Sequence, residues 1–293
     1  MNLALTVLEI VAPVFLLAGF GLGWVKLGFE YRLQFVTQLA VNVAVPCLIF
    51  VALMKTEIDR AALGLFVVAG FSTHFVVIIL MSSFIRALKL DQRTFQAPMN
   101  FGNTGNLGLP LCVFAFGEVG LGYAVAMLAI STILAFSYGI YLVAGRGAFG
   151  QILKEPLMWG TGLGALFLWQ GWETPRFLTN TLELTGQMAI PLMLLTLGVA
   201  MGRLVADKLV QALALSAVKL LICVSVGACM GWAFGLDHTA FGVLVLQMAM
   251  PVAVTSYLLA EKYEADGPAV AGMVMVSTTL AVISLPVLLA LLI

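Results

Sequence analysis

Charged side chains are scarce in this sequence of 293 residues: aspartate, glutamate, lysine and arginine together account for 10%, and the formal net charge is zero. Soluble domains carry about a quarter charged residues. A protein that binds nucleic acid needs a basic surface to meet the phosphates, and the sequence contains no basic cluster. The composition therefore argues against a soluble protein and against nucleic acid as a partner.

Motifs for catalysis or for holding a cofactor are also missing. The sequence has no Walker A motif, no HExxH zinc motif and no CxxC pair, and its four cysteines lie singly within apolar runs. We interpret these cysteines as packing residues without a metal or redox role. No apolar run carries the paired acidic residues of an intramembrane hydrolase or a sodium/proton exchanger. The sequence therefore predicts no enzyme, no metal and no cofactor, and leaves proton or sodium coupling open.

Apolar residues, in contrast, make up 62% of the chain. They form runs of roughly twenty residues, the length at which an α-helix crosses the hydrocarbon core of a bilayer. These runs predict an all-α integral membrane protein with ten transmembrane helices and no attached soluble domain. The predicted helices, numbered in chain order, cover residues 3–28, 33–53, 61–85, 94–117, 120–144, 156–172, 177–202, 209–234, 239–260 and 267–292.

The distribution of basic residues predicts the orientation. If the N-terminus lies outside, ten lysines and arginines fall in inward connections and three, Lys55, Arg60 and Arg176, in outward ones. Short loops rich in lysine and arginine stay on the cytoplasmic side. We therefore expect a multi-pass protein of the cytoplasmic (inner) membrane with both termini outside.

The two halves of the chain resemble each other at a spacing of 145 or 146 residues. The segment Asn42 to Pro46 (NVAVP) matches Gln187 to Pro191 (QMAIP), and Ser131 to Ala135 (STILA) matches Ser277 to Ala281 (STTLA). Because each half holds five predicted helices, an odd number, the second half enters the membrane upside down. This plan of inverted repeats is typical of secondary transporters. The predicted repeats are residues 1–145 and 146–293.

The fourth and ninth predicted helices are interrupted at corresponding positions. Asn100 to Pro110 (NFGNTGNLGLP) places three asparagines, three glycines and a proline at bilayer depth, and Gln247 to Pro251 (QMAMP) interrupts the ninth helix. Proline removes a backbone donor and glycine weakens a helix. Unpaired backbone is so unfavourable in lipid that such breaks must be buried in protein or line a wet cavity. Packing kinks are the simpler alternative, but paired breaks favour a binding site.

The breaks predict a site for an anion. Each second half-helix would present free N–H groups at its positive end, which favour a carboxylate, and Pro110 suits the first turn of such a half-helix. Neutral amides can donate to a carboxylate and still release it. The substrate-binding residues that we predict are Asn42, Asn100, Asn103, Asn106, Pro110, Gln187, Gln247, Pro251, Thr255 and Ser256.

Two ionisable residues lie near the middle of predicted helices. They are His74 in the third and Lys219 in the eighth, separated by the repeat spacing of 145 residues. Charge at this depth is costly and marks a functional hypothesis. Lys219 can neutralise a substrate carboxylate or carry a proton, and His74 can carry a proton. Alternatively, Lys219 bonds carbonyl groups of a neighbouring broken helix, and His74 packs as a neutral side chain.

Several of these segments resemble the auxin efflux carrier family. They are Asn103 to Pro110 with Phe116 to Gly120, Asn42 to Phe50, and Met250 to Ala253 with Ala260 to Tyr263. The resemblance extends over nearly the whole chain, and the segment ending at Pro110 is its most specific part. Only about ten residues, near Arg146 to Glu155, separate the halves, so the long central loop of the plant carriers is absent.

The resemblance implies a fold of the sodium/proton antiporter or bile-acid symporter type. Broken helices 4 and 9 would cross at the substrate site, where the matching residues are Asn103, Asn106, Pro110 and Pro251. Helices 1, 2, 6 and 7 would form a scaffold, and helices 3–5 and 8–10 a moving transport bundle. Members of the family are often homodimers in the lipid bilayer.

The leading hypothesis is a secondary transporter of small organic anions, auxin-like or malonate- or malate-like carboxylates, that works by alternating access at the crossover. One alternative is a sodium-coupled symporter of the same fold, in which crossover carbonyls and amides hold sodium. Another is a membrane sensor that binds an anion without moving it. The sequence shows no soluble signalling domain, which disfavours the sensor.

Overall fold

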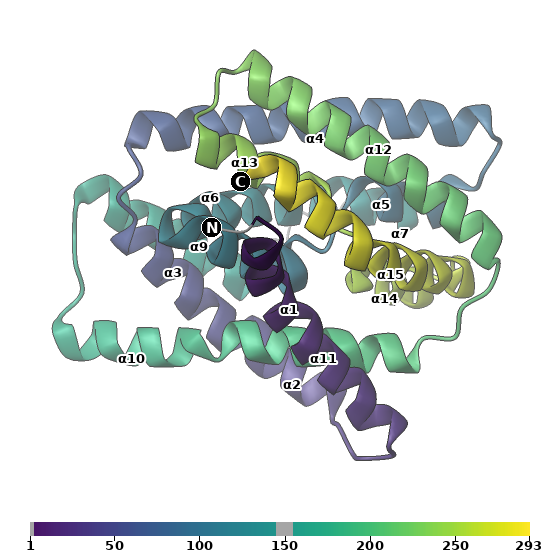
Figure 1. The fold of residues 1–293 in the computed structure, drawn as a ribbon, viewed down its shortest axis with the longest axis horizontal. Helices are drawn as coiled ribbons and strands as arrows, with labels where there is room; N and C mark the ends of the chain where they lie inside the picture. Colours follow the sequence, from purple (N-terminus) through teal and green to yellow (C-terminus); the bar gives the residue numbers. More distant parts are fainter. Residues whose placement is uncertain (1–2, 145–154) are drawn as a thin grey trace.

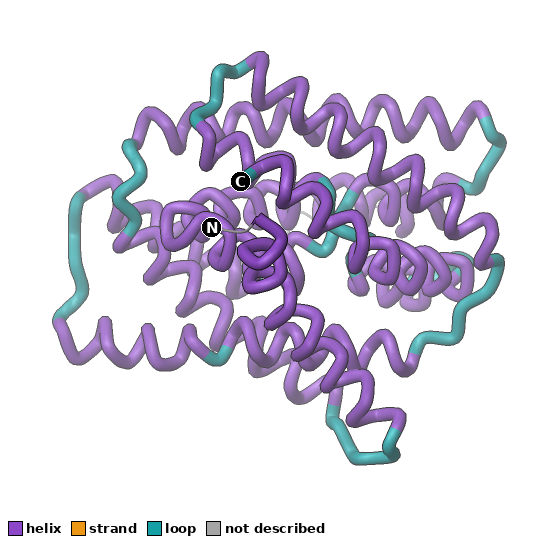
Figure 2. Tube along the Cα trace, in the orientation of Figure 1, coloured by secondary structure: helices purple, strands orange, loops and turns teal. Residues whose placement is uncertain are grey.

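The computed structural model describes residues 3–144 and 155–293 and is helical throughout these ranges, apart from one isolated β-bridge and the connecting loops (Figures 1 and 2). The first group of helices is α1 (Leu3–Lys26), α2 (Leu33–Leu39), the π-helical η1 (Ala40–Ala44), α3 (Val45–Lys55), α4 (Arg60–Ala87), α5 (Gln92–Asn100), the π-helical η2 (Thr104–Gly108), α6 (Leu109–Leu134), the π-helical η3 (Ala135–Gly139) and α7 (Ile140–Ala144). The second group is α9 (Pro156–Gln170), α10 (Arg176–Gln187), α11 (Ala189–Arg203), α12 (Leu209–Ala233), α13 (His238–Met248), α14 (Val254–Lys262) and α15 (Gly267–Leu292).

Seven helical stretches within the described residues are long and apolar enough to cross a membrane. They are Leu3–Lys26, Leu33–Lys55, Arg60–Ala87, Thr104–Val143, Arg176–Arg203, Leu209–Ala233 and Gly267–Leu292. The prediction of an all-helical protein that spans the membrane several times is confirmed. The predicted boundary between the repeats, at residues 145 and 146, and the basic residues Arg146 and Lys154 lie outside the described residues.

Several of the ten predicted ranges take a different form. The fourth and fifth meet in α6, which continues across a kink at Gly117, where φ is 65° and ψ is −157°. Only glycine adopts this conformation readily. The sixth range is the 15-residue α9, and the ninth is divided into α13 and α14. The glycine and proline positions explain why these segments are short or bent.

The helices form two packing groups, each of which combines helices from both parts of the chain, and the two meet at the middle of the molecule. α1 crosses α11, and α3 packs against α9 and α10. In the other packing group α12 contacts α4, α13 and α15, and Figure 1 shows α12 running obliquely across α4 near one edge. A single large cluster of buried apolar residues connects both groups. The interrupted helices α5 and α13 lie within this packed region, so their ends are held by neighbouring helices.

Aspartates begin four of the helices. The side chains of Asp59, Asp91, Asp237 and Asp266 accept hydrogen bonds from backbone N–H groups in the first turns of α4, α5, α13 and α15. Such caps satisfy donors that have no partner within the helix. Asp266 also accepts a hydrogen bond of 2.8 Å from the Lys208 ammonium. That ammonium holds the pKa of the Asp266 carboxyl below its ordinary value.

We expect Asp266→Ala to lower the free energy of unfolding by about 1 kcal/mol, because it removes the cap of α15. Asp266→Asn should stay within a few tenths of the parent, because asparagine caps as well as aspartate and an exposed ion pair contributes little. Since the folded pKa is lowered, the carboxylate's contribution is present at neutral pH and is lost as pH falls through that pKa. Thermal unfolding of detergent-purified variants at neutral and acidic pH measures both effects; equal stability of the alanine variant would contradict the capping role.

Candidate functional site

The first break separates α5 from the helical course that resumes at Thr104. Asn103 begins this course: its side-chain Oδ1 accepts from the N–H of Asn106 at 3.3 Å, and its carbonyl accepts from two later N–H groups. Among the described residues, the N–H groups of Thr104 and Gly105 have no hydrogen-bond partner. Pro110 is the second residue of α6 and follows the π-helical turn η2. Pro110 thus lies in the first turn of α6, as predicted, but the free donors precede it by more than a turn because η2 comes first.

The second break, between α13 and α14, is held by three different elements at three consecutive residues. The Lys219 ammonium on α12 donates to the carbonyl of Met250 at 3.0 Å. The N–H of Asn103 donates to the carbonyl of Pro251 at 2.7 Å. The N–H of Val252 donates to the hydroxyl of Ser277 on α15 at 3.0 Å. Backbone groups that the broken helix cannot pair internally are thus paired from outside it.

The two breaks lie against each other. Gly102 and Val252 form an antiparallel β-bridge, and Figure 2 shows both breaks as loop segments in the interior. A Cβ atom on Gly102 would lie 3.0 Å from both the Cβ and the carbonyl oxygen of Met250. The close approach of the two segments therefore favours glycine at position 102.

A cavity of about 210 Å³ lies beside the crossing breaks. Both second half-helices start at its wall, one with Thr104 and Gly105 and the other with Ala253 and Val254. The other polar residues that line it are Asn103, Asn106, Ser131, Thr132, Glu155 and Thr255. Because helix N-termini carry partial positive charge and unpaired N–H groups, their convergence favours an anion.

Glu155 also lines this cavity, a position that the sequence did not predict. It precedes α9, and its side chain caps no N–H group there. It is the one ionisable residue among the described residues that line the cavity. Burial raises the pKa of its carboxyl above the ordinary value. In the sequence Glu155 stands at the end of the connection between the halves, and no local signal marks it as a residue of the site.

The predicted substrate-binding residues fall into three groups. Asn103, Asn106 and, from the second half-helix, Thr255 line the cavity. Residues that are buried beside the breaks but do not line it are Asn100, Pro110, Gln247, Pro251 and Ser256. Asn42 and Gln187 are exposed and do not line this cavity, although their segments match in the sequence, and Gln187 lines a second, wider cavity. The structure therefore brings together the residues of the two breaks but not the amides of the second and seventh predicted helices.

Several buried amide atoms at the breaks have no protein partner among the described residues. They are both side-chain polar atoms of Asn100, Nδ2 of Asn103 and Oε1 of Gln247. The other end of the Gln247 amide donates to the sulfur of Cys112 at 3.6 Å, and the amide packs against Gly108. Buried polar groups are normally hydrogen-bonded, and exceptions in native proteins mark functional or hydrated positions. The breaks thus contain polar side-chain atoms that are free to form hydrogen bonds with a ligand or with water.

His74 lies one layer behind the cavity. Its Nδ1 is 3.0 Å from the carbonyl of Gly70 and its Nε2 is 3.0 Å from the hydroxyl of Ser131, which lines the cavity. Its ring stacks on Phe101, with 6.4 Å between the centroids. Lys219 does not line the 210 Å³ cavity and contacts the far side of the second break. The structure therefore contains the contact between Lys219 and the carbonyl of a broken helix that the sequence offered as an alternative.

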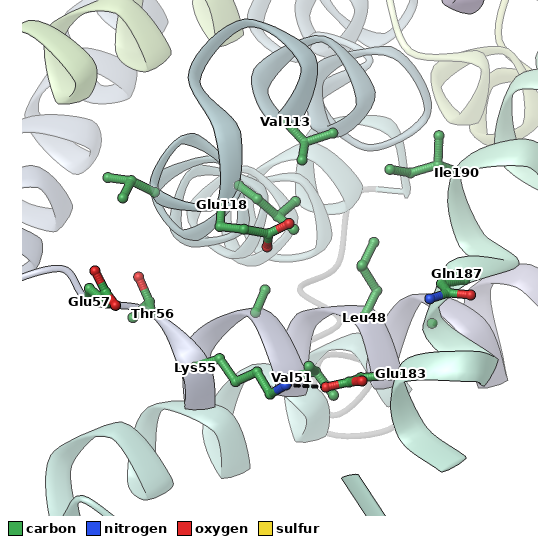
Figure 3. Close-up of a pocket in the computed structure, with 14 residues that line it drawn as sticks. Leu48, Val51, Lys55, Thr56, Glu57, Val113, Glu118, Glu183, Gln187 and Ile190 are labelled. Atoms are coloured by element: carbon green, nitrogen blue, oxygen red, sulfur yellow. Dashed lines mark hydrogen bonds and ion pairs between the residues drawn. The ribbon is translucent and has the colours of Figure 1, made fainter. Parts of the chain in front are cut away.

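A second, wider cavity of about 710 Å³ lies between α3, α6, α10 and α11 (Figure 3). Lys55 on α3 forms an ion pair with Glu183 on α10 at its wall, and Glu118 extends into it from α6. Leu48 and Ile190 line this cavity, whereas Val45 and Met193, about one turn away on the same helices, line the smaller one. The two cavities therefore follow each other along shared helices.

Comparison with known proteins agrees with a membrane-transport role. A family model described as "Membrane transport protein" matches residues 6–161 and 148–289. An uncharacterized transporter of Methanothermobacter thermautotrophicus is 27% identical over 265 residues, which cover 85% of each chain. An uncharacterized transporter of Methanocaldococcus jannaschii is 23% identical over 193 residues, which cover 62% of each chain.

The close approach at Gly102 can be tested against a second glycine of the same segment. Gly102→Ala should lower stability by about 1–3 kcal/mol, because its methyl group would press on Met250 in a packed core. Gly105→Ala is the matched control: its Cβ would lie 3.5 Å from the methyl carbon of Met193, an ordinary contact. Thermal unfolding of the purified variants measures the difference, and equal melting temperatures would contradict the crossing geometry.

Proposed function

The chain belongs to the family of membrane transport proteins that includes the auxin efflux carriers, and from this premise we propose that it is a secondary transporter of small organic anions, with carboxylates as its substrates. One observation supports the anion most directly: two half-helix N-termini open onto a single cavity whose polar side chains, apart from Glu155, are neutral amides and hydroxyls. An ammonium or guanidinium would hold a carboxylate more tightly, but neutral donors allow the release that each transport cycle needs.

The size of the cavity supports a small substrate. Its volume of about 210 Å³ lies below the roughly 300–1,000 Å³ of pockets for drug-sized ligands. A mono- or dicarboxylate of a few carbon atoms matches this space. The apolar side chains of Val45, Leu128 and Met193 in the same wall would contact its hydrocarbon part.

The proposed architecture is two inverted repeats of five helices, residues 1–145 and 146–293. In support, α5 and α13 both end at a break, and α4 and α12, which precede them, carry His74 and Lys219 toward those breaks. Counting the kink at Gly117 as the end of one helix and the start of the next restores ten helices. The scaffold would then comprise α1 to α3 and α9 to α11, and the transport bundle the remaining helices.

Alternating access follows from the two successive cavities. Sliding of the bundle past the scaffold by about one helical turn would carry the crossover from the side of the 210 Å³ cavity to that of the 710 Å³ cavity. The excess of basic residues in inward connections assigns Lys55 and the wide cavity to the outside, and Glu155 and the small cavity to the inside. We propose that the protein works in this orientation in the cytoplasmic membrane.

Uptake of radiolabelled mono- and dicarboxylates into proteoliposomes tests the function, with Asn106 as the site residue. Asn106→Asp preserves side-chain shape and suits the start of a helix, so the protein should fold, but its charge repels an anion. We expect transport to fall on the order of tenfold or more. Asn106→Ala should take up the carboxylate more slowly than the parent. Asn42→Ala, the matched control outside the cavity, should take it up at the parental rate.

Full transport by Asn106→Asp would contradict the site. Binding of a carboxylate by the parent without accumulation in vesicles would instead indicate a membrane anion sensor.

A pH dependence is expected from Glu155, which shares the cavity with the proposed carboxylate. Two carboxylates at one site disfavour the ionised form of each. Since burial already raises the pKa of Glu155, the protonated form persists to higher pH than for an exposed glutamate, and anion binding should strengthen as pH falls through that pKa. Glu155→Gln should flatten the pH profile of uptake and raise uptake under alkaline conditions. An unchanged profile would show that the substrate alone titrates.

A further inference from the structure

The ammonium of Lys219 occupies the carbonyl end of a broken helix. The side chain is 3% exposed and donates to the carbonyl of Met250 at 3.0 Å. α13 ends two residues earlier, at Met248, so the partial negative charge of its C-terminus faces the ammonium. A cation is electrostatically favoured there, as it is at unwound carbonyl groups generally.

Apart from Lys219 itself, the polar side chains that line the cavity beside the ammonium all carry hydroxyl groups, and the other lining side chains are apolar. Ser216, Ser277 and Ser284 line a cavity of about 10 Å³ beside the ammonium, room for about one water molecule. The Ser216 hydroxyl is 2% exposed and has no hydrogen-bond partner among the described residues. No acidic residue belongs to the described lining of this cavity. Carbonyl and hydroxyl oxygens without a carboxylate are ligands suited to a monovalent cation rather than to a metal of higher charge.

We propose that Lys219 is a tethered cation: its ammonium fills the position at which a free monovalent cation would otherwise bind the carbonyl end of α13. The chain thereby carries its own charge at this end of the crossover, and transport requires no sodium. The part of this inference that concerns transport rests on the proposed function, whereas the part that concerns cation binding does not.

The corresponding residue of the first half does not play this role. His74 bonds the carbonyl of Gly70, one turn earlier on its own helix, and the hydroxyl of Ser131. It touches the first break only by stacking on Phe101. The tethered cation is therefore a property of the second break alone, where the Met250 carbonyl would otherwise be buried without a partner.

Variants that shorten or replace the Lys219 side chain test the proposal. Lys219→Ala leaves space beside the Met250 carbonyl and the serines into which sodium, ammonium or methylammonium can enter. Lys219→Ser leaves nearly the same space and supplies a small hydroxyl, which guards against a failure of the alanine variant to fold. Lys219→Met fills the space without a charge and serves as the control of matched length.

The first measurement is the melting temperature of each purified variant in sodium, ammonium, methylammonium or choline chloride at equal ionic strength. We expect the melting temperatures of Lys219→Ala and Lys219→Ser to rise with the logarithm of the concentration of the small cations and not with choline, which is too large. The parent and Lys219→Met should show no such selective rise. Absence of a selective rise in both small variants would overturn the proposal, whether or not the protein transports carboxylates.

The second measurement is uptake into proteoliposomes in sodium or choline buffer. The parent should transport equally in both. Lys219→Ala should lose transport on the order of tenfold in choline and regain most of it in sodium or ammonium, and Lys219→Met should stay low in every salt. Sodium-dependent transport by the parent, or parental rates in Lys219→Met, would overturn the tethered cation. Failure of the parent to move any carboxylate would overturn the proposed function, while the melting temperatures still decide the cation site.

Discussion

The structure depends on pairing the backbone that two broken helices leave open inside an apolar protein. Neither break can satisfy its own groups, and an unpaired group at this depth costs several kcal/mol. The Asn103 N–H donates to the Pro251 carbonyl, and Gly102 bridges Val252, so each break supplies part of what the other lacks. Lys219 and Ser277 supply the rest from α12 and α15. The packing of these four segments around the crossing is therefore a condition for having a crossing at all.

The same backbone pairing leaves helix ends of opposite partial charge on different sides of the crossing. The starts of both second half-helices open on the 210 Å³ cavity, where the N–H groups of Thr104 and Gly105 have no partner among the described residues. The carbonyl end of α13 lies on the other side, against the Lys219 ammonium. Positive helix ends thus face a cavity that solvent or substrate can enter, and a negative end faces a cation that belongs to the chain. In the proposed transporter the anion is exchangeable and the cation is not.

The sequence predicted the helices and the breaks well because their signals are local: apolar runs, glycine and proline. It also indicated, as one of two alternatives, that Lys219 bonds a broken helix. Contacts between distant segments were harder to predict. Asn42 matches Gln187 in the repeat, yet Val41 and Val45 line the cavity, because residues four apart share a helix face and Asn42, one position after Val41, lies on another face. Glu155 lines the cavity although it is distant in sequence from both breaks, and α6 continues across two predicted helices through the backbone conformation of Gly117.

The charges of the wider cavity bear on how a carboxylate would pass through it. Lys55 is already paired with Glu183, whereas Glu57 and Glu118 have no ion pair among the described residues. A cleft with an excess of one charge lowers the local concentration of ions of the same sign. For the proposed substrate this cavity therefore offers little binding of its own, and the half-helix ends at the crossover must provide nearly all of it. An anion that has left the crossover toward the acidic cavity would return less readily than it would from a neutral one, so the wide cavity favours release over capture.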